Sequence, residues 1–341
     1  MSYNQLINQI NSGTTDNFFS SFIADLASEN DIDLSRYTFN KNKLNVSDIN
    51  DLQNRIINSK SVLSLSTSGT TGYPKIKTHK IKSLLKNTRK MSSNSTWLFT
   101  YNNRHMGGVQ VLLQAIINLD CIVDVYKKDR NFILKQIDKM KVTHISATPT
   151  FYRMLLPFEK VYENVSRVTV GGERSDTKTI KFIKTFFPRA KINNIYATTE
   201  TGAILFSNSH IFTINKNIVV DGTLRVKLND GSIHDTGDLV QMISDTEFVF
   251  CGRNTNIINI GGNNINPVEI EDIIKSHNKI KNAVVYGKPN KLLGNVLACD
   301  VILLDSMTKQ ELRHYMKSHI NNSYKIPRII HFKDNIKVSN T

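Results

Sequence analysis

The sequence of 341 residues has only three cysteines, Cys121, Cys251 and Cys299, and none of them forms a C-x-x-C pair. Each lies in an apolar stretch, so we expect small core residues in a reducing compartment, with no support for a metal or catalytic role. Long apolar runs are lacking too, because nowhere do about eighteen apolar residues follow one another. The first eleven residues are polar. The sequence therefore predicts no signal peptide, no membrane span and a cytoplasmic location.

Acidic residues are in short supply: 29 Asp and Glu stand against 44 Lys and Arg, which gives a net charge of +15. Such a balance favours polyanionic partners. The basic residues are scattered, however, without a long basic block or interleaved aromatic residues, so we expect no specific nucleic-acid binding. Phosphate-bearing small molecules or an acidic carrier protein would be attracted equally well.

A run of hydroxyl groups, two glycines and one lysine follows the apolar stretch at residues 62–65. Its composition suits a phosphate-binding loop, because glycine turns gather backbone N–H groups and Lys75 adds charge. A solvated linker is the alternative reading. No Gly-Lys-Ser/Thr closes the run, so it is not a Walker loop. The candidate phosphate-binding residues are Thr67, Ser68, Gly69, Thr70, Thr71, Gly72 and Lys75.

Short apolar runs alternate with helical patterns in the next part of the chain, which favours an α/β domain with a largely parallel sheet. A helix is expected near residues 18–26 and a basic helical stretch at 80–90. Strands are expected at residues 62–65, 122–126, 144–147, 167–170 and 192–196, and helices at 109–119, 131–140 and 177–187.

After about residue 206 the pattern becomes that of β-hairpins. Strands are expected at 218–220, 223–227, 239–243 and 247–251, with Asp-Gly and Asp-Thr turns between them. A boundary falls at 253–255. It separates a large domain, residues 1–252, from a small α+β domain, residues 256–341.

Two helix starts mark the small domain. Asn266 precedes Pro267 at the first helical position, and Thr308 opens a capping box with Glu311. Strands at 283–286, 296–304 and 329–332 flank these helices.

Three further motifs could serve a nucleotide. Gly171-Gly172-Glu173 follows a predicted strand and by itself is a common strand-to-helix turn. The segment 193–200 ends in an aromatic residue, two hydroxyls and a carboxylate, which suit a base, a phosphate and Mg²⁺; it could equally be an ordinary polar turn. Asp238 lies in a predicted hairpin turn, where a carboxylate could accept both hydroxyls of a ribose.

The ordered set, which covers the chain from about Leu63 to its last residue, resembles the adenylate-forming superfamily. This superfamily includes acyl- and aryl-CoA ligases, firefly luciferase and the adenylation domains of peptide synthetases. The resemblance implies an AMP-binding enzyme with a large N-terminal α/β domain, a small β-hairpin region and a mobile C-terminal α+β domain. It also implies ATP and Mg²⁺ as cofactors, with CoA or phosphopantetheine as acceptor.

Residue roles follow from the same resemblance. Thr67 to Lys75 would grip the β- and γ-phosphates, with Lys75, Thr199 and Glu200 as catalytic residues. Glu200 would bind Mg²⁺ and Thr199 the α-phosphate. The remaining nucleotide contacts would come from Gly171, Gly172, Glu173, Tyr196, Asp238 and Arg253, the substrate pocket from His105, Gly107 and Ala197, and the hinge from Thr255.

The reaction implied is attack of a carboxylate on the α-phosphorus of ATP, followed by transfer of the acyl group to a thiol. A small acyl or aryl carboxylate is favoured over an amino acid, because no acidic residue near His105 would pair with an α-ammonium group. His105 itself is either a pocket residue or an ordinary loop histidine.

The chain departs from the family at both ends. Only about sixty residues precede the phosphate-binding loop, fewer than in most members, so the N-terminal part is expected to be shortened. The sequence also stops at Thr341, before the Gly-Lys pair that the family's last motif would supply. The alternative hypothesis is therefore a pseudoenzyme that binds a nucleotide or acyl-adenylate without turnover.

Overall fold

The computed structural model describes residues 6–8, 18–34, 44–67, 75–86, 88, 95–198, 202–228, 231–290 and 293–336. The chain forms two compact units, one ending at Ser146 and the other beginning at Ala147. The predicted α/β class is confirmed in both, whereas the predicted domain boundary at 253–255 stays a prediction. Among the helices within these ranges, none is long and apolar enough to cross a membrane.

The first unit contains a three-stranded sheet and, in another sheet, a set of parallel strands. One sheet has the order β1-β2-β3, with β1 and β2 parallel and β3 antiparallel to β2. Its strands are β1 (Ile32–Asp33), β2 (Val62–Thr67) and β3 (Lys75–Lys80), and its neighbouring helices are α2 (Phe18–Ala27), α3 (Ile49–Asn58) and α4 (Ile81–Leu85). The prediction of a basic helix at 80–90 is wrong in where the helix begins and in how long it is. Lys80 still belongs to β3, and α4 ends at Leu85.

The strands expected at 122–126 and 144–147 are present in the same unit, on either side of a strand at 96–99 that was not predicted. β4 (Thr96–Phe99) pairs in parallel with both β5 (Cys121–Asp124) and β6 (His144–Ala147). The connecting helices are α5 (Met106–Asn118) and α6 (Arg130–Lys139), and Val109, Leu112 and Leu113 on α5 are fully buried.

The second unit begins with a further βα arrangement. β7 (Arg167–Gly171) pairs in parallel with β8 (Lys191–Thr198), and β9 (Gly202–Ser207) is antiparallel to β8. α7 (Pro149–Met154) precedes β7 and α8 (Thr177–Phe186) follows it. Both helices have N-caps: the side chains of Thr148 and Asp176 accept hydrogen bonds from backbone N–H groups of the first turn.

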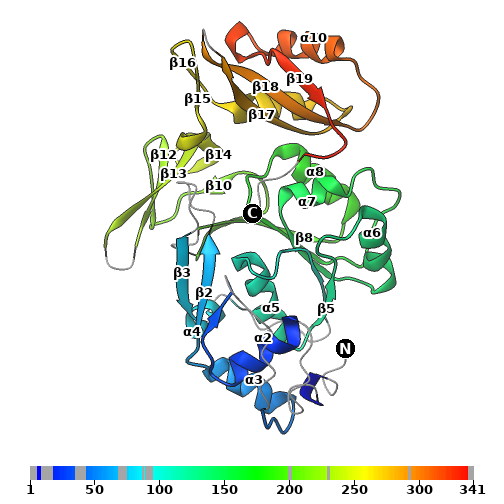
Figure 1. The fold of residues 1–341 in the computed structure, drawn as a ribbon, viewed down its shortest axis with the longest axis vertical. Helices are drawn as coiled ribbons and strands as arrows, with labels where there is room; N and C mark the ends of the chain where they lie inside the picture. Colours follow the sequence, from blue (N-terminus) through cyan, green and yellow to red (C-terminus); the bar gives the residue numbers. More distant parts are fainter. Residues whose placement is uncertain are drawn as a thin grey trace. The chain divides into compact units, whose positions relative to one another are not determined.

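The predicted β-hairpins form a five-stranded sheet of order β10-β14-β13-β12-β11 (Figure 1). Its strands are β10 (Phe212–Thr213), β11 (Ile218–Val220), β12 (Thr223–Lys227), β13 (Ile233–Met242) and β14 (Glu247–Arg253). The expected turn at 235–238 is wrong, because β13 continues through it. β12 pairs with Asp235 and Leu239 on either side of a register shift, and Gly237 between them has a φ of +70°. The Asp-Thr-Gly-Asp sequence therefore forms an irregularity within the strand and does not end it.

The last part of the second unit, residues 258–336, has its own hydrophobic core around Ile270, Ile274, Leu297 and Met316. We call it the C-terminal part. β17 (Ile280–Asn290), β18 (Gly294–Leu303) and β19 (Ile329–Phe332) form its main sheet, with α10 (Lys309–His319) drawn beside it in Figure 1. Its other elements are β15 (Ile258–Ile260), β16 (Asn263–Ile265), α9 (Pro267–Ser276) and the 3₁₀ turn η2 (Ser323–Lys325), and a further 3₁₀ turn, η1 (Asn254–Asn256), precedes it.

Both predicted helix starts in the C-terminal part are confirmed. Asn266 caps α9, and Thr308 and Glu311 form the reciprocal capping box of α10. The cysteine prediction holds only for Cys299, which is buried; Cys121 is exposed and Cys251 half-buried.

Candidate nucleotide-binding site

The Gly171-Gly172-Glu173 turn lies at the carboxyl end of β7. Gly171 pairs with Ile195 on β8, and a Cβ at Gly171 would stand 3.3 Å from the Ile195 carbonyl oxygen. Gly172 has a φ of +80°, a conformation that side chains other than glycine adopt at a cost. The turn is therefore next to the end of β8, where Tyr196 follows Ile195.

The Glu173 carboxylate is already engaged within the protein. It accepts hydrogen bonds from the backbone N–H of Thr150 at 3.1 Å and from the Thr150 hydroxyl at 2.6 Å. The Arg153 guanidinium, which is buried, lies 3.8 Å from the same carboxylate and 3.2 Å from Asp176. A base placed at this turn would thus meet mainly its backbone, because the carboxylate anchors the turn to α7.

Three predicted residues come together where β8, β13 and β14 approach one another. The Tyr196 hydroxyl donates to Asp238 Oδ2 at 2.5 Å, and Arg253 Nε donates to Asp238 Oδ1 at 2.7 Å. Asp238 is only 6% exposed, whereas the Arg253 side chain is 45% exposed. The structure therefore joins the predicted adenine and ribose residues into one cluster, which we call the Tyr196–Asp238–Arg253 cluster.

The carboxylate in this cluster keeps unused acceptor capacity. An ionised carboxylate offers about four lone-pair positions. The two protein donors above occupy one position on each oxygen. Asp238 can thus still accept hydrogen bonds from two hydroxyl groups, the arrangement that a ribose diol presents.

Phe250 on β14 supports the cluster, and sequence reasoning missed it. Its ring stacks on that of Tyr196 with centroids 4.4 Å apart and an interplanar angle of 24°. Burial, followed by the nearby charge of Asp238, raises the pKa of Tyr196, so the phenol stays a hydrogen-bond donor. Phe248 and Phe250 lie two residues apart and therefore on the same face of β14, and this spacing of two aromatic residues is the sequence signal that could have revealed the contact.

The remaining nucleotide predictions fall mostly outside the described residues. Ser68, Gly69, Thr70, Thr71 and Gly72 lie there, as do Thr199 and Glu200. On either side of the first segment, Thr67 ends β2 and pairs with Lys75, the first residue of β3. Within the described ranges, no group of three or more His, Cys, Asp and Glu residues is placed to hold a metal ion.

Two of the predicted pocket residues lie at the start of α5 in the first unit. His105 is the N-cap residue of α5, and burial lowers its pKa. A side chain at Gly107 would approach the Tyr101 ring to 3.1 Å, so the glycine allows this close packing. Ala197 belongs to β8 of the second unit. Their role in a substrate pocket stays a prediction.

The hinge prediction falls on η1. Thr255 is exposed there, and its hydroxyl contacts the Asn256 side chain at 3.4 Å. Its part in any movement stays a prediction.

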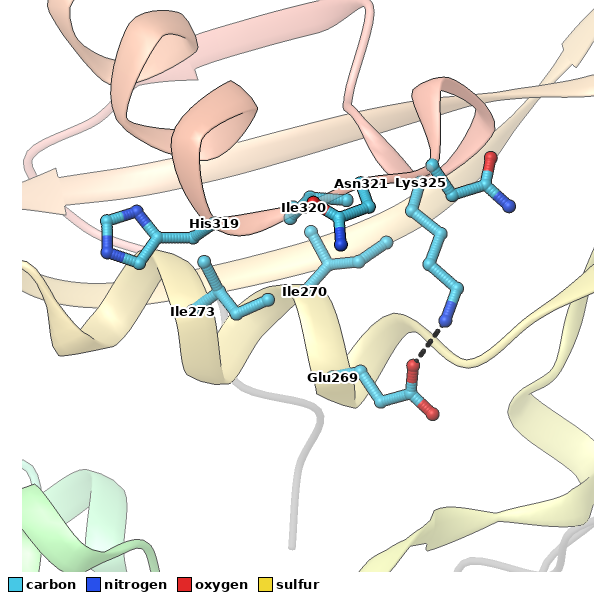
Figure 2. Close-up of a pocket in the computed structure, with 8 residues that line it drawn as sticks. Glu269, Ile270, Ile273, His319, Ile320, Asn321 and Lys325 are labelled. Carbon is cyan, nitrogen blue, oxygen red and sulfur yellow. Dashed lines mark hydrogen bonds and ion pairs between the residues drawn. The ribbon is translucent and has the colours of Figure 1, made fainter.

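A separate pocket of about 210 Å³ lies within the C-terminal part (Figure 2). Glu269 on α9 and Lys325 on η2 form an ion pair of 2.7 Å beside it. None of its residues belongs to the Tyr196–Asp238–Arg253 cluster. The lining residues are Glu269, Ile270, Ile273, His319, Ile320, Asn321, Asn322 and Lys325.

Comparison with protein families gives two matches. The model of the AMP-binding enzyme family matches residues 27–226, and that of the AMP-binding enzyme C-terminal domain matches residues 269–340. A 2-succinylbenzoate–CoA ligase from Staphylococcus aureus is 24% identical over 315 residues, which cover 81% of this chain and 64% of that protein. The chain therefore spans less than two thirds of the length of this relative.

Solved structures show the same fold. An o-succinylbenzoate CoA synthetase from Bacillus subtilis, in complex with its acyl-adenylate intermediate, superposes with a TM-score of 0.61 at 22% identity, over 80% of this chain and 66% of that one. An anthranilate CoA ligase in complex with anthranoyl-AMP gives a TM-score of 0.66 at 16% identity, and the match covers 82% of this chain and 64% of that one.

Proposed function

Because the chain belongs to the AMP-binding enzyme family, we propose that it takes part in ATP-dependent activation of a carboxylic acid as an acyl-adenylate, followed by transfer of the acyl group to a thiol. The observation that carries the proposal is the Tyr196–Asp238–Arg253 cluster, a buried carboxylate with free acceptor positions beside an aromatic ring and a cation. These groups suit the ribose and base of an adenine nucleotide.

The nucleotide would be held by residues from several strands. Asp238 would accept hydrogen bonds from the ribose hydroxyls, with Arg253 fixing the orientation of its carboxylate. The backbone of Gly171 to Glu173 and the ring of Tyr196 would border adenine. Tyr196 has one ring face covered by Phe250, so its position in the slot is fixed before a ligand arrives.

The chemical step is proposed at the α-phosphorus. The substrate carboxylate attacks it, a P–O bond forms, and the bond to pyrophosphate breaks. Thr199 would position the α-phosphate, and Lys75 with the hydroxyls of 67–71 would neutralise the β- and γ-phosphates. Mg²⁺, when held by Glu200, would supply further charge neutralisation. The hinge at 253–255, including Thr255, would allow residues 256–341 to move before the second step, in which the thiol sulfur attacks the acyl carbon and AMP leaves.

An acyl or aryl carboxylate is the proposed substrate class, with His105, Gly107 and Ala197 as candidate pocket residues. Two relatives are named for 2-succinylbenzoate and one structure for anthranilate. These acids are therefore the first to test. CoA is the proposed acceptor, and a carrier-protein phosphopantetheine is the alternative. The relatives are named as ligases, which gives no support to the pseudoenzyme hypothesis.

Exchange of labelled pyrophosphate into ATP tests the proposal. A panel of carboxylic acids should include one that drives exchange, and Lys75→Ala or Glu200→Ala should abolish it. Lys80→Ala is the matched control, because Lys80 is an exposed lysine at the other end of β3. Acid-dependent exchange that survives both changes would refute the assignment.

A further inference from the structure

Arg174 directly follows the Gly171-Gly172-Glu173 turn and makes two kinds of contact. Its Nε donates to the carbonyl oxygen of Phe250, the residue whose ring stacks on Tyr196. Its two terminal nitrogens reach the carboxylate of Asp272 on α9, with Nη1 at 2.9 Å from Oδ1 and Nη2 at 2.7 Å from Oδ2. One guanidinium therefore links the candidate nucleotide site to the C-terminal part.

Lys178, in the first turn of α8, makes a second connection. Its ammonium group donates to the carbonyl oxygens of Lys275, His277 and Ile280 at 2.7, 2.8 and 3.0 Å. All three of its N–H groups thus have acceptors. The first two carbonyls belong to the end of α9, where the helix dipole favours a cation.

Two residues in the same region donate hydrogen bonds from the C-terminal part back to the preceding elements. The Lys281 ammonium donates to the carbonyl oxygens of Met154 and Leu156 at 3.2 and 2.8 Å. The Asn266 side chain donates to the Cys251 carbonyl at 2.8 Å. These contacts are polar, whereas the C-terminal part has a separate apolar core. A polar junction between two cores can separate without exposing either core.

We propose that Arg174 is a positioning residue that holds the C-terminal part in this orientation and makes the orientation depend on the occupancy of the nucleotide site. Its backbone continues the turn that would border adenine, and its side chain is fixed by the Phe250 carbonyl. A ligand that shifts the turn or the Tyr196–Phe250 stack would move the guanidinium relative to Asp272. The second half of this proposal, the response to nucleotide, rests on the proposed function; the first half does not.

Two variants separate the ion pair from the rest of the junction. Arg174→Met removes every donor of the side chain and leaves a shorter, unbranched apolar side chain. Asp272→Asn removes the carboxylate charge, which also lies 3.4 Å from Lys275 within α9. Lys325→Met is the matched control, because it breaks an ion pair of the same helix that stays inside the C-terminal part. Thermal melting verifies that each variant folds. If Arg174→Met does not fold, the comparison of Asp272→Asn with the unaltered chain decides the first half of the proposal.

Electron paramagnetic resonance distances between spin labels provide the readout in the full chain. The labels replace the exposed Lys227 on β12 and Lys317 on α10 by cysteine, with Cys121 and Cys251 changed to serine. Without nucleotide, Arg174→Met and Asp272→Asn should each lower the ratio of the main orientation to all others about tenfold, a size typical of coupling between sites. Lys325→Met should leave this ratio unchanged. The double variant of Arg174→Met and Asp272→Asn should lower the ratio no further than Arg174→Met alone, since the Arg174–Asp272 ion pair is already lost in that variant.

An unchanged distance distribution in Asp272→Asn, or an equal change in Lys325→Met, would overturn the first half of the proposal. For the second half, saturating AMP should change the orientation ratio of the unaltered chain about tenfold and that of Arg174→Met much less. If calorimetry shows no AMP binding, the proposed function fails while the result without nucleotide still stands. If AMP binds and the distribution stays unchanged, the link through Arg174 is wrong.

Discussion

Asp238 on β13 lies directly opposite Arg253 on β14, and Arg253 Nε donates to Asp238 Oδ1 at 2.7 Å. The carboxylate is buried while the guanidinium is partly exposed. The pairing of two antiparallel strands therefore holds a charged acceptor at a fixed place, with Tyr196 of β8 bonded to its other oxygen. A site whose groups are fixed in this way loses little freedom when a ligand binds.

Phe250 should contribute strongly to stability. Its side chain is 8% exposed and contacts Tyr196, Phe212 and Phe248 through their rings. Phe250→Ala should lower the free energy of unfolding by about 3 kcal/mol, because it leaves a cavity and removes the ring stack. Urea titration measures the change. Phe206→Ala, at a side chain that is 52% exposed, should cost less than about 0.5 kcal/mol; equal losses would contradict the packing described.

Gly172 should matter for both stability and nucleotide binding. Its φ of +80° makes Gly172→Ala cost about 1–2 kcal/mol in unfolding free energy. Gly222 has a φ of +84°, and nothing lies within 4 Å of a Cβ built there, so Gly222→Ala is the matched control. Both variants should lose similar stability in urea titration, and only Gly172→Ala should weaken AMP binding in calorimetry. Equal AMP affinity in the two variants would argue against a nucleotide at this turn.

His105 should make the protein less stable in mild acid. Burial lowers its pKa below the ordinary value of 6.5. The folded chain then binds fewer protons than the unfolded chain, so the free energy of unfolding falls as the pH drops below 6.5 toward the lowered pKa. Urea titrations at pH 7.5 and 5.5 should show a smaller fall for His105→Gln than for the unaltered chain. The exposed His314, changed to Gln, serves as the control; an identical fall in all three proteins would contradict the burial of His105.

Local pattern predicted the strands and helices well where the chain alternates between them. The strand at 144–147 and the caps at Asn266 and Thr308 are present as expected, because apolar period and capping side chains act over a few residues. The turn expected at 235–238 was wrong, since pairing with β12 and β14 is decided by residues distant in sequence.

In the candidate site, too, local sequence patterns predicted some residues and missed the contacts between distant ones. The order of motifs identified Tyr196, Asp238 and Arg253, which the structure brings together. The engagement of Glu173 with Thr150 and of Arg174 with Asp272 was not predicted. These contacts join residues 23 and 98 positions apart, and no local pattern encodes such a pairing.

Calorimetric titration with AMP tests the central claim, that the Tyr196–Asp238–Arg253 cluster holds an adenine nucleotide. The unaltered chain should bind AMP at one site, and Asp238→Asn should raise the Kd at least about tenfold, since charge-assisted hydrogen bonds to the ribose would be lost. Asp221→Asn, which alters a partly exposed ion pair with Arg225 on the same sheet, should leave the Kd unchanged. No AMP binding by the unaltered chain, or equal Kd values for Asp238→Asn and the unaltered chain, would contradict the account.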